Sequence, residues 1–242
     1  MCAKFLEQRS TRILAAVGVG PGDPELITVK ALRVIERADL VLAPVAGPGR
    51  SSAAELVIRA HMNVEAAPVV FPMTRDAVER DAALRGQLEE LRPRWEGAAS
   101  VALPVIGDSA LYATAAYFYG VWRTIDPSVG LELVPGVSAH SLAASRAGRF
   151  LALGDEVFSV VPGTAGREMV ALALKSCDAA ALYKPSALGE ELRSVVESAG
   201  PWREILRADR AGLPGERLIK GPEALSRPDE YLSTLLLWRR GR

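Results

Sequence analysis

Three short turns contain the residues whose types and spacing could do chemistry. Residues 18–24 read GVGPGDP, residues 107–112 read GDSALY and residues 134–139 read VPGVSA, and each follows or ends an apolar run. Because glycine has no side chain, such a turn lets a ligand approach the backbone closely. In open α/β sheets, ligands bind outside the carboxyl ends of the strands, so we expect the three turns to converge on one cleft near a domain boundary.

The spacing of the first turn argues against a nicotinamide dinucleotide. Its glycines follow G-x-G-x-G rather than G-x-G-x-x-G, and Pro21 and Pro24 cannot donate the N–H groups that a pyrophosphate needs. The next apolar run, 40–43, ends in Pro44 with no acidic residue to hold a ribose. No G-x-x-x-x-G-K-[ST] phosphate loop occurs in the sequence. A tight turn from strand to helix that binds nothing stays open as the alternative.

Helix capping is the alternative explanation for the polar residues of the other two turns. Asp108 or Ser109 is expected to be the N-cap of the helix that follows, because an isolated Gly-Asp pair more often has that role. Ser138 is the natural N-cap of the next helix. Three such turns at strand ends nevertheless favour a shared ligand site over three separate caps.

The sequence has few groups for metal or covalent chemistry. Its only cysteines and histidines are Cys2, Cys177, His61 and His140. These are too few for a disulfide framework or a thiolate metal site within one chain, so no metal is expected. We interpret His140, which follows the third turn, as a structural histidine.

Composition indicates which partners to expect. The 242 residues carry 29 Lys+Arg and 29 Asp+Glu, and the resulting formal charge of zero gives no reason to expect nucleic acid or an anionic membrane as a partner. The N-terminus, MCAKFLEQRSTR, lacks the apolar run of a signal peptide, and no stretch approaches the roughly 20 apolar residues of a membrane span. We therefore expect a cytoplasmic protein with a small-molecule ligand.

The elements that must position the turns alternate between strand and helix, as in an α/β protein. Periodicity predicts strands over residues 13–17, 40–43, 101–106, 131–134, 157–161, 179–184, 205–208 and 232–237. It predicts helices over residues 27–38, 78–95, 111–122, 139–147 and 187–199. Gly148 and Gly200 stand where C-terminal caps of the last two helices belong. The turn-rich segment 123–130 predicts a boundary between domains at 11–125 and 131–242.

Four segments in order resemble the signature of a known family. Residues 18–28 (GVGPGDPELIT), 30–44 (KALRVIERADLVLAP), 107–112 and 134–139 look like the signature of the tetrapyrrole methylases, which use S-adenosylmethionine. The resemblance extends from residue 12 to about residue 238. Residues 148–164 and 211–217 look specifically like the branch that methylates C20 of precorrin-2 or cobalt-factor II in cobalamin biosynthesis.

The resemblance implies two α/β domains with S-adenosylmethionine in the cleft between them and S-adenosylhomocysteine as its product. The residues implied to contact this cofactor are Pro21, Gly107, Asp108, Leu111, Tyr112, Ser138, Ala139, Tyr183 and Ala211. Two positions depart from the family's pattern: Ser109 stands where proline is common, and Tyr183-Lys184-Pro185 replaces a commoner Met-Lys-Val. An aromatic side chain at Tyr183 can supply apolar surface for adenine as methionine does.

The resemblance also implies a substrate and a mechanism. A tetrapyrrole bears several carboxylates, and we assign Asp23, Lys184 and Arg210 to its binding, whereas solvation at the surface explains Arg217 equally well. The sulfonium carries its own leaving group, so the protein needs neither a nucleophile nor a metal. A base that removes the proton stays unassigned, with Asp23 and Tyr112 as the candidates.

Alternative functions and the assembly follow from the same resemblance. A methyltransferase of this fold that acts on another ring position or on diphthine stays open, as does a non-catalytic tetrapyrrole- or nucleotide-binding module. A homodimer is implied, and the apolar strand 231–238 and the aromatic helix 111–122 would supply its surface. Burial of both segments within their own domains is the competing interpretation.

Overall fold

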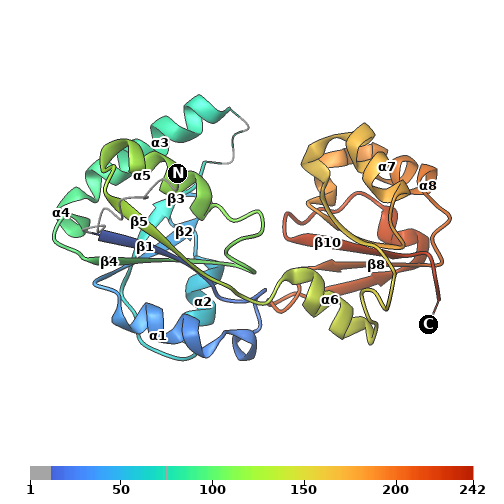
Figure 1. Cartoon of the computed structure of the whole chain (residues 1–242), viewed down its shortest axis with the longest axis horizontal. Coiled ribbons are helices and arrows are strands. Elements are labelled where there is room, and N and C mark those ends of the chain that lie inside the picture. The colour runs from blue at the N-terminus through green and yellow to red at the C-terminus, as the bar shows by residue number, and fades with distance from the viewer. Residues whose placement is uncertain (1–11, 73, 75, 242) are drawn as a thin grey trace, which may run out of the picture. The chain divides into compact units, whose positions relative to one another are not determined.

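The computed structural model describes residues 12–72, 74 and 76–241. Cys2 and residue 11, where the first predicted domain begins, lie outside this part of the chain. The chain divides between Val137 and Ser138 into two compact units (Figure 1).

The first unit is built on a sheet of five parallel strands. Their order is β3-β2-β4-β1-β5, so the last strand, β5, pairs with the first, β1. The strands are β1 (Arg12–Gly18), β2 (Leu40–Val45), β3 (Ala66–Val70), β4 (Ser100–Val105) and β5 (Val129–Val134). Because all five run in one direction, their carboxyl ends lie at one edge of the sheet.

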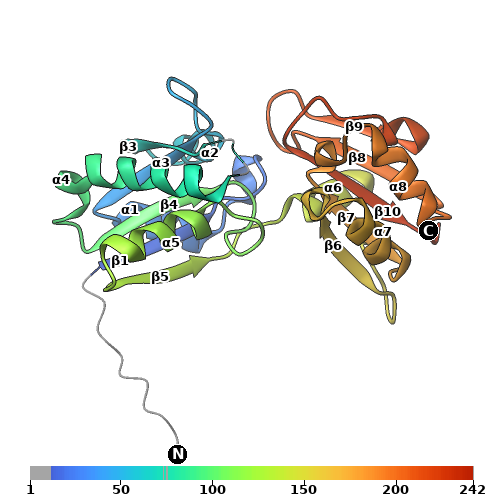
Figure 2. The same ribbon diagram turned by 90° about the horizontal axis from the view of Figure 1, so that it is seen from above.

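Helices cover both faces of this sheet (Figure 2). One face packs against α1 (Val29–Arg37) and α2 (Ala53–Arg59), and the other against α3 (Ala77–Glu90), α4 (Arg92–Trp95) and α5 (Ala115–Ile125). Alternate residues of β1 point to opposite faces of the sheet. Leu14 and Ala16 belong to the buried cluster on one face, and Ala15 and Val17 belong to the cluster on the other. Continuous apolar runs such as 101–105 are thus explained by burial on both faces.

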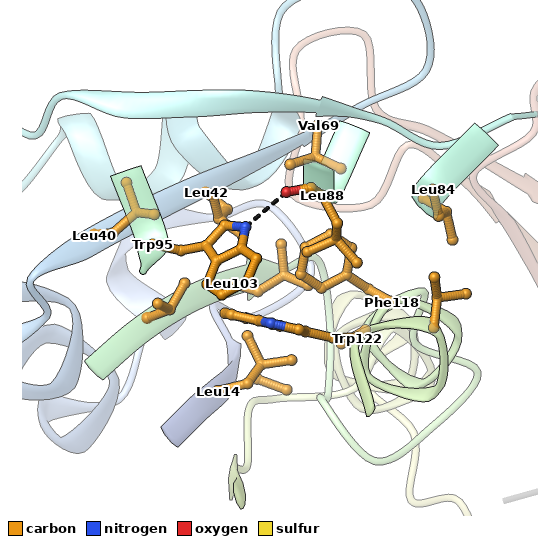
Figure 3. Close-up of a cluster of buried hydrophobic side chains, with 14 of the residues drawn as sticks. Leu14, Leu40, Leu42, Val69, Leu84, Leu88, Trp95, Leu103, Phe118 and Trp122 are labelled. Atoms are coloured by element: carbon orange, nitrogen blue, oxygen red, sulfur yellow. Dashed lines mark hydrogen bonds between the residues drawn. The ribbon is translucent and has the colours of Figure 1, made fainter. Parts of the chain in front are cut away.

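Aromatic side chains fix α5, the helix that follows the second turn, against the sheet (Figure 3). Trp122 and Phe118 are fully buried, and the Trp122 ring meets the rings of Trp95 and Phe118 edge-on at centroid distances of 5.3 and 5.7 Å. The Trp95 indole N–H donates to the Leu88 carbonyl at 2.7 Å, which joins α4 to α3. These residues of the aromatic helix are therefore core.

The second unit contains a mixed five-stranded sheet in the order β6-β7-β10-β8-β9. Strands β6 and β7 are parallel, and the other neighbours are antiparallel. In Figure 1, α7 and α8 lie on one face of this sheet and α6 on the other. The elements are α6 (Ala139–Ala147), β6 (Phe158–Pro162), α7 (Arg167–Lys175), β7 (Ala179–Tyr183), α8 (Leu192–Ser198), β8 (Glu204–Asp209), β9 (Arg217–Lys220) and β10 (Ser233–Trp238).

Every predicted strand is present, but several predicted boundaries are wrong. The helix predicted from residue 111 begins at Ala115, because Tyr112 has a φ of 52°, outside the helical region. The helix predicted over 78–95 is two helices, and Pro93 lies in the first turn of the second, α4. Gly148 is the left-handed cap that was predicted, with a φ of 66°, whereas the helix before Gly200 ends at Ser198 without such a cap.

The domain boundary also differs from the one expected at 123–130. Strand β5 pairs with β1 over residues 129–134, so this segment belongs to the sheet of the first unit. The predicted second domain, 131–242, began one strand too early for this division. Among the described residues, none of the helices combines the length and the apolar character that crossing a bilayer requires.

Candidate functional site

The three turns predicted to converge do meet, within the first unit. They follow β1, β4 and β5, which are neighbours in the sheet. The first and second turns form a two-way backbone bridge: Gly20 N–H donates to Gly107 O at 3.2 Å, and Gly107 N–H donates to Gly20 O at 2.7 Å. The third turn joins through Gly136, whose N–H donates to the Asp108 Oδ2 at 2.9 Å.

The closeness of this contact explains the glycines. A Cβ added at Gly18 would lie 2.7 Å from both Gly107 O and Gly136 N, and one added at Gly136 would lie 2.3 Å from Gly107 O. No side chain fits at either position without moving the backbone. A Cβ at Gly107, in contrast, would meet no atom within 4 Å. The second turn therefore presents open backbone, as close binding of a ligand requires.

Asp108 and Ser109 connect turns and do not cap the helix that follows. The two oxygens of Asp108 accept from Ala110 N–H at 2.8 Å and from Gly136 N–H at 2.9 Å. The buried Ser109 hydroxyl donates to the Val134 carbonyl at 2.8 Å. The N-cap prediction is wrong for both residues, because α5 begins several residues later. Their role is to tie the second turn to the third.

Three predicted site residues share an uncommon backbone conformation. Tyr112, Lys184 and Arg210 have φ values of 52°, 52° and 54°, and among the described residues they are the only non-glycine residues with positive φ. This conformation is unfavourable for L-residues and is concentrated at functional sites. The sequence patterns alone gave no indication of it.

The remaining predicted residues of the first unit lie at the same turns. Pro21 is buried and Leu111 is half-buried, while Asp23 is the N-cap of a short 3₁₀ helix (Pro24–Leu26) and accepts from Glu25 N–H at 3.1 Å. Tyr112 is 40% exposed, and partial burial raises the pKa of its phenol above the ordinary value of 10.0. A phenol with a raised pKa stays protonated near neutral pH, which disfavours Tyr112 as the base.

In the second unit, Tyr183 is tied to the start of α6. Ser138 is the N-cap of α6 as predicted, although its side chain makes no capping hydrogen bond. The Tyr183 hydroxyl accepts from His140 N–H at 3.3 Å and lies 2.8 Å from the imidazole Nδ1. Tyr183 thus satisfies a donor in the first turn of α6, next to Ala139. His140 packs against Tyr183 and Phe158, which agrees with a structural role.

The turn after β8 carries Arg210 and Ala211 and is held by an acid that the sequence interpretation missed. Glu216 accepts from Gly212 N–H at 2.6 Å and lies 3.3 Å from the Arg146 Nε on α6. Arg210 donates from Nε to the Pro214 carbonyl at 2.9 Å. Glu216 lies within segment 211–217, but its partners could not be predicted from the sequence because the folded turn brings them together. Glu216 is a positioning residue for this turn.

Arg217 has a structural partner as well. It lies 3.2 Å from the Asp209 Oδ2, and Asp209 is fully buried beside the buried Arg207 at 3.0 Å. Burying a carboxylate is costly unless it is paired, and here two guanidinium groups and the Ser233 hydroxyl surround it. Arg217 is therefore more than a solvated surface residue, because it pairs with a buried carboxylate. Among the described residues, no group of three or more His, Cys, Asp or Glu side chains is arranged to hold a metal ion.

Comparison with known proteins identifies the family to which these turns belong by sequence. The model of the Tetrapyrrole (Corrin/Porphyrin) Methylases matches residues 14–225, which include all three turns. The chain belongs to this family. The tetrapyrrole methylase resemblance read from the four sequence segments is thereby confirmed.

Individual tetrapyrrole methylases match along most of their length. The cobalt-precorrin-2 C(20)-methyltransferase of Salmonella typhimurium is 30% identical over 232 residues, covering 93% of this chain and 95% of that protein. The precorrin-2 C(20)-methyltransferase of a Sinorhizobium species is 28% identical, covering 93% and 94%.

A solved structure shares the fold. Uroporphyrin-III C-methyltransferase from Thermus thermophilus, crystallised with S-adenosyl homocysteine, has a TM-score of 0.66 at 22% identity, covering 94% of this chain and 97% of that one. The predicted α/β fold of the tetrapyrrole methylases is confirmed.

Proposed function

We propose that this tetrapyrrole methylase transfers a methyl group from S-adenosylmethionine to C20 of a precorrin-2-type tetrapyrrole in cobalamin biosynthesis. The observation that carries the proposal is the backbone contact among the three turns at the carboxyl ends of β4, β1 and β5. The relatives named as C(20)-methyltransferases, each matched over 93% of this chain, support the choice of ring position.

The open backbone at Gly107 and the strained Tyr112 fit a cofactor that is held mainly by main-chain groups. S-adenosylmethionine would supply both the methyl group and the leaving group. In the first unit we assign its binding to Pro21, Gly107, Asp108, Leu111 and Tyr112. In the second unit we assign it to Ser138, Ala139, Tyr183 and Ala211.

The protein's own contribution is to bind and orient the reactants. Holding two reactants in line contributes about 7–11 kcal/mol to lowering a barrier in favourable cases, so no nucleophilic side chain is required. We assign Asp23, Lys184 and Arg210 to the tetrapyrrole. The base that removes the proton stays unassigned.

Turnover with defined substrates tests the proposal. Purified protein is incubated with methyl-labelled S-adenosylmethionine and either precorrin-2 or cobalt-factor II, and the labelled position is read by NMR. We expect transfer to C20 with at least one of them. Calorimetry is expected to show one site per chain for S-adenosylhomocysteine. Absence of binding, or transfer to another carbon only, would contradict the proposal.

Two alternatives predict other outcomes of the same experiment. A methyltransferase for another ring position or for diphthine would turn over that substrate and leave precorrin-2 unchanged. A non-catalytic binding module would bind the tetrapyrrole without transferring the label. Relatives that match this chain over nearly their full length are named as C(20)-methyltransferases. These names favour methylation of C20 over both alternatives.

We also propose a cytoplasmic homodimer. Every residue of β10 is buried in the middle of its sheet, and Phe118 and Trp122 of α5 are core, so the apolar surface that the two predicted segments offer is limited mainly to the exposed side chains of Tyr112, Tyr117, Tyr231 and Leu232. Light scattering at micromolar concentration is expected to give twice the chain mass of 25.8 kDa. A mass of one chain that does not change on concentration would rule the dimer out.

A further inference from the structure

The loop that follows β2 leaves the sheet at the edge that carries the three turns. Strands β2 and β4 are parallel neighbours, with Leu40 paired to Val101 and Val41 to Ala102. Both strands run on in the same direction beyond these pairs, β2 to Val45 and β4 to Val105. The loop over residues 46–52 therefore leaves the sheet at the same edge as the second turn, from the neighbouring strand.

This loop is held at both ends and presents Arg50 to solvent. The Arg50 N–H donates to the Gly47 carbonyl at 3.2 Å, and Gly49 has a φ of 69°, which favours glycine. At its far end, the buried Ser52 caps α2 by accepting from Glu55 N–H at 3.3 Å. Arg50 is exposed between these fixed points.

The charge of Arg50 is not compensated by a neighbouring acid. Within the described part of the chain, no carboxylate lies within 4 Å of its guanidinium, and the nearest acid in sequence, Glu55, pairs with Arg59 at 2.7 Å. Across the edge, both oxygens of Asp108 are taken by backbone N–H groups. Five other arginines of this unit have acidic partners, namely Arg12, Arg59, Arg80, Arg92 and Arg94. Arg33, Arg37, Arg85 and Arg123 have none among the described residues, but they lie on helices and not on a loop at this edge.

We propose that Arg50 binds a carboxylate of the tetrapyrrole. The inference rests on the proposed function, since that substrate brings several carboxylates to this edge. A guanidinium binds a carboxylate through two parallel hydrogen bonds, which fixes orientation as well as position. The methionine part of the cofactor also carries a carboxylate. The tetrapyrrole offers several carboxylates to one arginine, whereas the cofactor offers one, and the two sources give different results in the kinetics below.

Kinetics of Arg50→Ala separate these sources of the carboxylate. We expect KM for the tetrapyrrole to rise about tenfold or more, the loss typical of one charge-assisted hydrogen bond, with less dependence of KM on salt. Affinity for S-adenosylhomocysteine and thermal stability are expected to stay as in wild type. Arg50→Lys keeps the charge but not the two-point geometry. We expect its KM for the tetrapyrrole to lie between those of wild type and Arg50→Ala.

Arg37→Ala is the matched control. Arg37 is also exposed and has no carboxylate within 4 Å in the described structure, but it ends α1, the helix that returns to the amino-terminal edge of the sheet. We expect no change in KM from this substitution. An unchanged KM in Arg50→Ala, or a loss confined to S-adenosylhomocysteine affinity, overturns the inference while wild-type turnover upholds the proposed function. Absence of tetrapyrrole binding and turnover by the wild type overturns both.

Discussion

Gly136→Ala is expected to destabilise the first unit and to abolish cofactor binding. The added Cβ would lie 2.3 Å from Gly107 O and 2.7 Å from the Gly18 carbonyl carbon, and all three positions are backbone at strand ends. Relief requires the turns to separate, so we expect the cost to reach or exceed the upper end of the about 1–3 kcal/mol typical of overpacking. Chemical denaturation and calorimetry with S-adenosylhomocysteine measure the two effects.

Gly86→Ala is the control for this substitution. Gly86 lies within α3, and a Cβ there would meet no atom within 4 Å. Alanine is favoured over glycine in a helix interior by about 1 kcal/mol, so this variant is expected to be at least as stable as wild type and to bind the cofactor normally. A Gly136→Ala protein with unchanged stability and affinity would show that the turns are not packed as described.

Asp108→Ala is expected to weaken binding of S-adenosylhomocysteine by more than tenfold. The substitution removes the acceptor of Gly136 N–H and of Ala110 N–H, and it frees the second and third turns from each other. Leaving a partly buried N–H unsatisfied costs about 1–3 kcal/mol, so stability should fall as well. Asp108→Asn retains one acceptor oxygen, so we expect it to lose less cofactor affinity and less stability than Asp108→Ala.

Asp39→Ala separates the effect on binding from the effect on stability. Asp39 accepts from Ala99 N–H at 3.0 Å and from Ser100 N–H at 2.8 Å, at the start of β4 and the opposite edge of the sheet. Hydrogen bonds from Ser100 hold the pKa of Asp39 below its ordinary value, so its contribution is present at neutral pH and is lost as the pH falls through the lowered pKa. We expect Asp39→Ala to lower stability and to leave cofactor affinity unchanged. If Asp108→Ala binds S-adenosylhomocysteine as tightly as wild type does, the role of Asp108 is structural only.

Central strands were predictable because their burial on both faces gives continuous apolar runs. The two strands that were missed, β3 and β9, lie at the edges of their sheets. Pro68 interrupts the apolar pattern of β3, and β9 consists of four mostly exposed residues with charges at both ends. Edge position alone does not explain the failure, because the edge strands β5 and β6 were predicted; the proline of β3 and the exposure of β9 weakened their signals further.

The roles of individual site residues were less predictable than the turns themselves. Glycine spacing located all three turns, since their close contact excludes side chains at Gly18 and Gly136. The function of Asp108 depends on Gly136, which is 28 positions away, and that pairing exists only in the folded sheet. From local sequence, capping was the natural interpretation of Asp108, and tertiary structure gave it a different partner.

The contact among the turns has a consequence for how specificity can change in such a protein. A frame made by main-chain atoms and two short side chains keeps its geometry when other residues change, provided that its glycines, Asp108 and Ser109 stay. The outer loops have no such restriction: Arg50 is anchored by the ends of its loop and not by its own side chain. Ordinary point substitutions there can alter which molecule is accepted while the inner frame remains the same. Recognition of a new substrate is therefore separable, position by position, from retention of the methyl donor.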